Sequence, residues 1–224
     1  LLQMKENTLI YGCMGLGGSH DSSSLSKSDE KKAFVALETA LEHGITTFDH
    51  ADIYKMGKAE IVFGRFLKAN PDIQDKIKVQ SKAGIVLNGG PHNSSTYCSS
   101  RSYLLQQVEK SMEQLNVSHL DTFLIHRPDV LTSFEELGAT LHLLHEQGLV
   151  HEVGVSNMSA PQMEALQKNM DIPLVANQLQ FSLDHLQLIE QSVLVNTESS
   201  IDPTVVGLLD YLQTNQRQLQ VWGA

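Results

Sequence analysis

The sequence is poor in cysteine and in positive charge, and each shortage argues against a class of protein. Its two cysteines, Cys13 and Cys98, match no metal-binding spacing and are too few to stabilise a chain of 224 residues by cross-linking. Lys and Arg number 16 against 26 Asp and Glu, which gives a formal net charge of −10. Such a chain repels phosphate backbones, so we expect no nucleic-acid partner.

Long apolar runs are also missing. None of them approaches the roughly 20 residues that a membrane-spanning helix needs. The first ten residues, LLQMKENTLI, are interrupted by Lys5, Glu6 and Asn7, so they lack the apolar centre of a secretory signal. We therefore expect no membrane association, and the few cysteines favour a reduced, cytoplasmic protein.

Short apolar segments instead alternate with amphipathic ones along the whole chain. Strands are predicted at 9–15, 45–49, 77–82, 121–126, 152–157, 173–178 and 219–224. Helices are predicted at 28–44, 58–69, 102–115, 133–148, 159–170 and 202–216. Their predicted N-terminal signals are Ser28, the capping boxes Ser133–Glu136 and Ser159–Gln162, and Asp202 followed by Pro203.

Strict alternation of strand and helix predicts parallel strands joined by helical crossovers. Two architectures fit this pattern, an open doubly wound sheet and a (β/α)8 barrel. The open nucleotide-binding sheet requires G-x-G-x-x-G after its first strand, and the segment GCMGLGG at 12–18 has a different spacing. The α/β barrel is therefore favoured, and it predicts functional side chains at the carboxyl ends of successive strands.

Polar residues do follow strand after strand. They are Asp49, Lys82, His126, Ser156, Asn157, Asn177 and Gln178, and Tyr54 lies in the loop after the second predicted strand. In a barrel these ends converge on one rim, although they lie far apart in the sequence. We therefore expect Asp49, Tyr54, Lys82 and His126 to face one pocket.

These four residue types together indicate a proton donor. The ammonium of Lys82, held by Asp49, would lower the pKa of the Tyr54 phenol from its ordinary value of about 10. His126 could donate a hydrogen bond to the same substrate oxygen. Such a site suits polarisation of a carbonyl group, and because it offers no nucleophile, a hydride from a nicotinamide is the natural attacking group. The side chains at 156, 157 and 178 are suited to binding a carboxamide.

Five motifs, FDHADIY, SK, LIHRPD, GVSN and NQ, resemble in order those of the aldo-keto reductase superfamily, especially bacterial oxidoreductases of the YdhF type. The resemblance implies a TIM barrel and NADPH-dependent reduction of a small-molecule carbonyl substrate. It implies Tyr54 as general acid, Asp49 and Lys82 as residues that adjust its pKa, and His126 as the residue that orients the carbonyl. It also implies that Ser156, Asn157 and Gln178 hold the nicotinamide amide.

The resemblance stops at the seventh strand, where the printed sequence ends. We expect one barrel domain over 1–224, incomplete at its C-terminus, without the eighth strand and without the family's clamps for the adenosine phosphate. An aromatic residue that stacks on the nicotinamide is expected just after Ala224, although Trp222 lies close to that position. The full-length protein is expected to be a monomer. Residues 1–224 alone would be expected to associate through the unpaired edge of their sheet.

Two other functions fit the same residues. Lys82 could form a Schiff base in an aldolase, although pairing with Asp49 would keep its amine protonated. The chain could also belong to a regulatory subunit that binds NADP without turnover. No metal is expected: His142 and His145 share a helix but lack a third ligand. The polar segment 84–100 either lies over the catalytic mouth and helps to select substrates or is a loop without a role, and the sequence favours neither.

Overall fold

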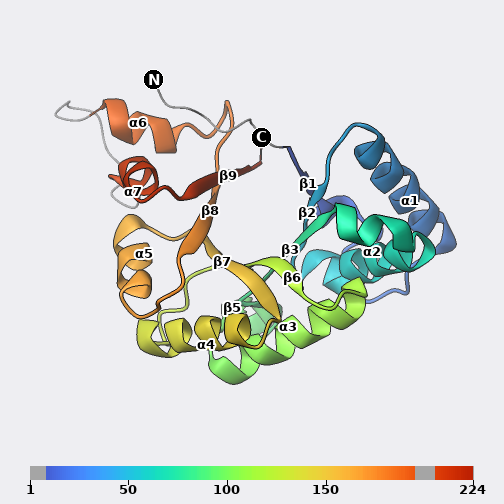
Figure 1. The fold of residues 1–224 in the computed structure, drawn as a ribbon, viewed down its shortest axis with the longest axis horizontal. Helices are drawn as coiled ribbons and strands as arrows, with labels where there is room; N and C mark the ends of the chain where they lie inside the picture. The colour runs from blue at the N-terminus through green and yellow to red at the C-terminus, as the bar shows by residue number, and fades with distance from the viewer. Residues whose placement is uncertain (1–8, 195–204, 224) are drawn as a thin grey trace.

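The computed structural model describes residues 9–194 and 205–223. Its main sheet has seven parallel strands in the order β1-β2-β3-β6-β7-β8-β9. The sheet is curled, and the helices lie along its outer side (Figure 1). Parallel strands with helical crossovers are therefore confirmed, and all carboxyl ends of the strands point to one end of the sheet. Among the described residues no pairing joins β9 back to β1.

The strands are close to the predicted ones, but the first two are shorter. They are β1 (Ile10–Gly12), β2 (Thr47–Asp49), β3 (Lys78–Ala83), β6 (Leu120–Ile125), β7 (Val150–Ser156), β8 (Leu174–Gln180) and β9 (Gln218–Trp222). The strand predicted at 9–15 ends early because Cys13–Gly15 forms a 3₁₀ turn. The polar segment 84–100 is not a plain loop, since β4 (Ile85–Val86) and β5 (Thr96–Tyr97) pair in it as an antiparallel hairpin.

Every predicted helix has a counterpart, with bounds that shift by a few residues and most at the start of the last one. The helices are α1 (Lys27–Glu42), α2 (Lys58–Ala69), α3 (Arg101–Leu115), α4 (Phe134–Glu146), α5 (Ala160–Gln167), α6 (Gln187–Val193) and α7 (Leu208–Thr214). The cap of α1 is Ser26 and not the predicted Ser28, because the Ser26 hydroxyl accepts the hydrogen bond from the Asp29 backbone.

Two other predicted N-terminal signals are found as capping interactions. The capping box at Ser159 and Gln162 is present in both directions. Ser133 accepts a hydrogen bond from the Glu136 backbone, which is one half of the predicted box.

The segment between β8 and β9 departs most from prediction. It contains two short helices: α6, which was not predicted, and α7, which lies within the helix predicted at 202–216. Helix α7 begins only at Leu208, after Gly207 in the left-handed conformation. The predicted cap at Asp202 and Pro203 lies outside the described residues.

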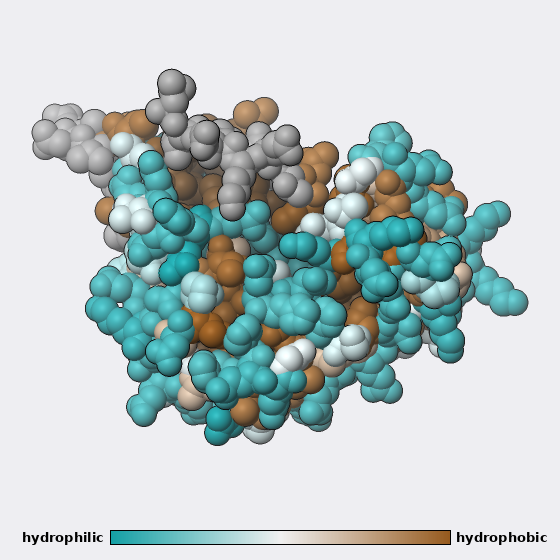
Figure 2. All heavy atoms as spheres, viewed as in Figure 1, coloured by the Kyte–Doolittle hydropathy of each residue, from teal (hydrophilic) through white to brown (hydrophobic). Residues whose placement is uncertain are grey.

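The hydrophobic core fills the space between the sheet and its outer helices. Phe48 of β2 packs on Phe63 of α2, with ring centroids 5.2 Å apart. A Cβ at Gly64 would lie 2.0 Å from the backbone oxygen of Gln114, so close packing of α2 on α3 requires glycine there. In Figure 2 hydrophilic side chains cover most of the periphery and hydrophobic ones gather towards the middle. Of the helices in the described ranges, none has the length and apolar character that a membrane crossing requires.

Candidate functional site

A buried ion pair lies at the carboxyl ends of β2 and β3. Lys82 Nζ is 2.7 Å from each carboxylate oxygen of Asp49, and the two residues are 1% and 6% exposed. Burial lowers the pKa of Lys82, but the charge of Asp49 and the hydrogen bonds of the amine outweigh burial and raise the pKa overall. Lys82 is therefore a fixed cation held in place by its acidic neighbour.

Tyr54 is held over this pair by a tight turn. It opens the 3₁₀ segment Tyr54–Gly57, in which Lys55 and Met56 adopt left-handed φ values of 51° and 57°. Lys82 Nζ lies 5.0 Å from the centroid of the Tyr54 ring. The His126 ring, just after β6, meets the Tyr54 ring edge-on at a centroid distance of 6.2 Å. The structure thus brings the four predicted side chains together.

The pKa of Tyr54 differs from the prediction. Burial raises it, the charge of Lys82 and a hydrogen bond with Lys82 lower it, and the charge of Asp49 raises it again. The net direction is upward, so the expected net lowering is wrong, although Lys82 acts in the expected sense. The reason is that the same burial that brings Lys82 close to the phenol also removes the water that would stabilise a phenolate. At neutral pH the phenol keeps its proton and remains able to donate it.

His126 is a neutral imidazole at this site. Burial and the charges of Lys82 and Arg127 lower the pKa of His126 to about 3. Its buried Nδ1 has no hydrogen-bond partner among the described residues. A neutral ring has one nitrogen that donates and one that accepts. His126 can therefore offer a hydrogen bond to a bound oxygen without competing with Lys82 as a second cation.

Two glutamines complete the site, and the sequence interpretation missed both. Gln80 Nε2 donates to Asp49 Oδ1 at 2.5 Å and to Gln220 Oε1 at 2.9 Å. Gln220 Nε2 donates back to Gln80 Oε1 at 2.9 Å, so the two amides fix each other's orientation. Gln80 lies two residues before Lys82 on the same face of β3, a spacing that could have revealed it. Gln220 gave no such signal because its position depends on how β9 is placed.

The three residues predicted to bind a carboxamide use part of their hydrogen-bonding capacity on one another. Ser156 Oγ donates to the backbone oxygen of Gln178 at 2.9 Å, and Asn157 Nδ2 donates to Ser156 Oγ at 2.7 Å. The Gln178 amide donates to Gln220 Oε1 at 3.1 Å. Asn177, also named as a strand-end residue, donates instead to the backbone oxygen of Met158 in the core. Of the predicted trio, only Asn157 lines the neighbouring cavity.

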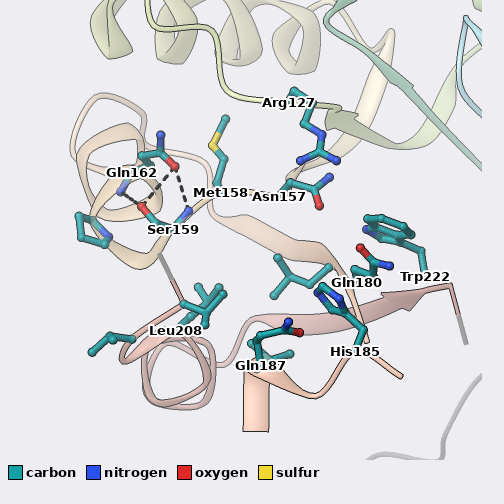
Figure 3. A pocket seen from close by; sticks show the side chains of 15 residues that line it. Arg127, Asn157, Met158, Ser159, Gln162, Gln180, His185, Gln187, Leu208 and Trp222 are labelled. Atoms are coloured by element: carbon teal, nitrogen blue, oxygen red, sulfur yellow. Dashed lines mark hydrogen bonds between the residues drawn. The ribbon is translucent and has the colours of Figure 1, made fainter. Parts of the chain in front are cut away.

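That cavity has a volume of about 820 Å³ and lies beyond the carboxyl ends of β6 to β9. Arg127 and Asn157 lie on one side of it and the indole of Trp222 on another (Figure 3). Because Arg127 directly follows His126, the cavity adjoins the ion-pair site. A cation, amide groups and an aromatic ring fit a ligand that combines negative charge with a flat carboxamide-bearing ring.

Comparison with known proteins gives a consistent result. The sequence profile of the Aldo/keto reductase family matches residues 8–197. The chain is 36% identical over 184 residues to the 6-dehydroglucose reductase of Agrobacterium fabrum, covering 81% of this chain and 60% of that protein. It is 36% identical over 154 residues to the oxidoreductase YdhF of Escherichia coli, covering 68% of this chain and 52% of that protein.

Among solved structures, the glycerol dehydrogenase of Gluconobacter oxydans superimposes with a TM-score of 0.76 at 25% identity. The superposition covers 96% of this chain and 58% of that one. The chain thus spans between about half and three fifths of the length of these relatives.

Proposed function

The chain belongs to the aldo/keto reductase family, and from this premise we propose that it is part of an NADPH-dependent oxidoreductase that reduces an aldehyde or ketone to an alcohol. The observation that carries the proposal is the placement of the Tyr54 phenol over a buried, carboxylate-anchored ammonium. The relatives described as reductases and oxidoreductases support the same reaction class.

The cavity beside the site fits the nicotinamide part of the cofactor. Asn157 would contact the carboxamide, with Ser156 and Gln178 holding the surrounding amides in place. Trp222 offers a ring face and Arg127 a positive charge for a phosphate. When bound, NADPH supplies the hydride. NADPH rather than NADH is proposed from the family resemblance.

Tyr54 acts as the general acid in this proposal. The substrate carbonyl oxygen accepts hydrogen bonds from the Tyr54 hydroxyl and from the neutral His126 ring, which align it and polarise the C=O bond. As negative charge develops on that oxygen, the phenol proton moves to it and the alcohol is formed. The phenolate left on Tyr54 is stabilised by Lys82, whose own charge is held by Asp49.

The ion pair argues against the alternative of a Schiff-base aldolase. A Schiff base requires an uncharged amine, and the raised pKa of Lys82 keeps the amine protonated at neutral pH. A regulatory subunit without turnover would keep the same pocket. The presence or absence of turnover in the full-length protein separates that alternative from an enzyme.

The test is oxidation of NADPH by the full-length protein with a panel of small aldehydes and ketones. Tyr54→Phe should lower kcat by about 10²- to 10⁴-fold, the usual contribution of a positioned general acid. Tyr211→Phe, which removes a phenol oxygen from helix α7 outside the site, is the matched control and should stay close to wild type. Unchanged turnover in Tyr54→Phe would reject the assignment of Tyr54, and NADPH binding without turnover on the panel would favour the regulatory alternative.

We further propose that the full-length protein is a cytoplasmic monomer in which residues 1–224 form most of one barrel domain. The two cysteines are free, which supports a reducing compartment. Light scattering of the full-length protein would test the monomer.

A further inference from the structure

A group of two histidines and one aspartate lies at the opposite end of the strands from the reaction site. Leu120 pairs with Val150 and Thr122 with Glu152, so Asp121 of β6 and His151 of β7 are register neighbours. His119 comes two residues before Asp121, just before β6 begins. Residues two apart in an extended chain lie on one side, and register partners in a parallel pair share a face. The three side chains therefore converge.

The ligand atoms of this group are close together. One side-chain nitrogen or oxygen from each of His119, Asp121 and His151 lies within 4.8 Å of the other two. The two imidazole rings are stacked, with centroids 3.9 Å apart and planes 24° from parallel. In residues 9–194 and 205–223 this is the one set of three histidine, cysteine or carboxylate side chains with such a spacing.

Neighbouring groups already orient two of the three ligands. Asp121 Oδ2 accepts a hydrogen bond from the Val79 backbone at 2.7 Å, which leaves Oδ1 to bind an ion. His119 Nδ1 lies 3.1 Å from the Ser118 hydroxyl, which leaves Nε2. Metal-binding histidines and carboxylates are characteristically fixed in this way by a second hydrogen bond.

We propose that His119, Asp121 and His151 bind a divalent first-row transition-metal ion of the Zn²⁺ type. Two imidazole nitrogens and one carboxylate oxygen are a ligand set that such ions prefer over Ca²⁺ or Mg²⁺. Binding at about 2.0–2.2 Å from each atom requires the three ligand atoms, which lie within 4.8 Å of one another, to turn towards one point. Three protein ligands leave a fourth position for water.

The ion would tie together the beginnings of three strands. Asp121 and His151 belong to β6 and β7, and the hydrogen bond to Val79 extends the connection to β3. Strand β6 is six residues long, so the site lies on the order of 20 Å from the carboxyl ends that carry the reaction. The proposed metal would therefore take no part in the proposed reduction, and the site does not depend on the proposed reductase activity.

The experiment measures Zn²⁺ binding by calorimetry and Co²⁺ binding by its visible absorption, using metal-free full-length protein. Wild type should bind one equivalent of Zn²⁺ with a rise in Tm, and Co²⁺ should give the d–d bands of a site with nitrogen and oxygen ligands. The double variant His119→Asn/His151→Asn should lose at least about 100-fold in affinity, since even indirect ligand supports are worth 10- to 100-fold.

The matched control is His142→Asn/His145→Asn, which removes the same number of imidazoles from helix α4. It should bind Zn²⁺ as wild type does. Asp121→Asn, which keeps a hydrogen-bond acceptor for Val79, should also weaken binding and provides a readout if the double histidine variant does not fold. Equal affinity in wild type and in the Asp121 or His119/His151 variants would overturn the proposal, as would loss of binding in the α4 control.

Discussion

The two ends of the parallel strands carry similar residue types in opposite environments. At the carboxyl ends Lys82 and Asp49 are almost fully buried, and burial and the charge of Asp49 together set the ionisation of Lys82. At the amino ends His119 and Asp121 are partly exposed and His151 is exposed. At the buried end, where the fold excludes water, the charge of Asp49 outweighs burial and keeps Lys82 a cation. At the solvent-exposed amino ends, the side chains of His119, Asp121 and His151 stay accessible to a ligand from solution.

The largest expected effect comes from breaking the buried pair. Lys82→Met should lower turnover of the full-length protein by about 10²-fold or more and destabilise it by about 3–5 kcal/mol, because it leaves the Asp49 carboxylate buried without a counter-charge. Denaturant unfolding and NADPH oxidation measure the two effects. Adding Asp49→Asn should restore much of the stability but none of the activity. Full stability in Lys82→Met alone would contradict the importance of this pair.

A second prediction concerns His50, which follows β2 at the same buried end. Burial and the charge of Lys82 lower the pKa of His50 to about 3, and neither ring nitrogen has a partner among the described residues. Between pH 6.5 and 3 the unfolded state binds a proton that the folded state does not, so stability falls as pH falls through this window. This loss should amount to about 1.4 kcal/mol per pH unit from this residue.

His50→Leu tests that slope. The variant removes the titrating imidazole, so its stability should depend less on pH between 6.5 and 3. It loses no hydrogen bond seen in the structure, so its stability at pH 7 should change little. Urea unfolding at several pH values measures the difference. If the pH dependence of the unfolding free energy did not change, His50 would be hydrated in the folded protein and would titrate as it does in the unfolded chain.

The smallest expected effect tests whether the interior amides contribute to the difference between the two ends. Gln220→Leu leaves the amides of Gln80 and Gln178 short of a partner and should cost about 1–3 kcal/mol. Because the orientation of Gln80 towards Asp49 is then no longer fixed, the pH profile of kcat should shift as well. Gln213→Leu, which removes an exposed amide from helix α7, serves as the control. A stability change without any shift in the pH profile would leave Gln220 only a packing role.

The sequence predicted the fold and the family because both depend on local patterns. Parallel strands follow from the alternation of segments, helix α2 was predicted at its observed bounds, and the resemblance to aldo/keto reductases is confirmed. Tyr54, Lys82 and their neighbours could be placed together because the carboxyl ends of parallel strands converge. Their catalytic and binding roles stay predictions.

The features that could not be predicted from the sequence depend on strand register and on burial. Gln220 reaches Gln80 only through the placement of β9, and His151 reaches Asp121 only through the pairing of β6 with β7. The predicted direction of the Tyr54 pKa shift was wrong because the exclusion of water from a site cannot be read from residue types. The hairpin of β4 and β5 was missed because its strands have two residues each, too few for a periodic pattern.

The amide pair of Gln80 and Gln220 has a consequence for how the molecule is assembled. Its two members are 140 residues apart in the sequence, one on β3 and the other on β9. Asp49, Tyr54 and Lys82 can leave the ribosome and fold together early, yet the amide beside them stays free to turn until β9 docks. The surroundings of Asp49 are therefore complete only when β9, far along the chain, has taken its place beside β8.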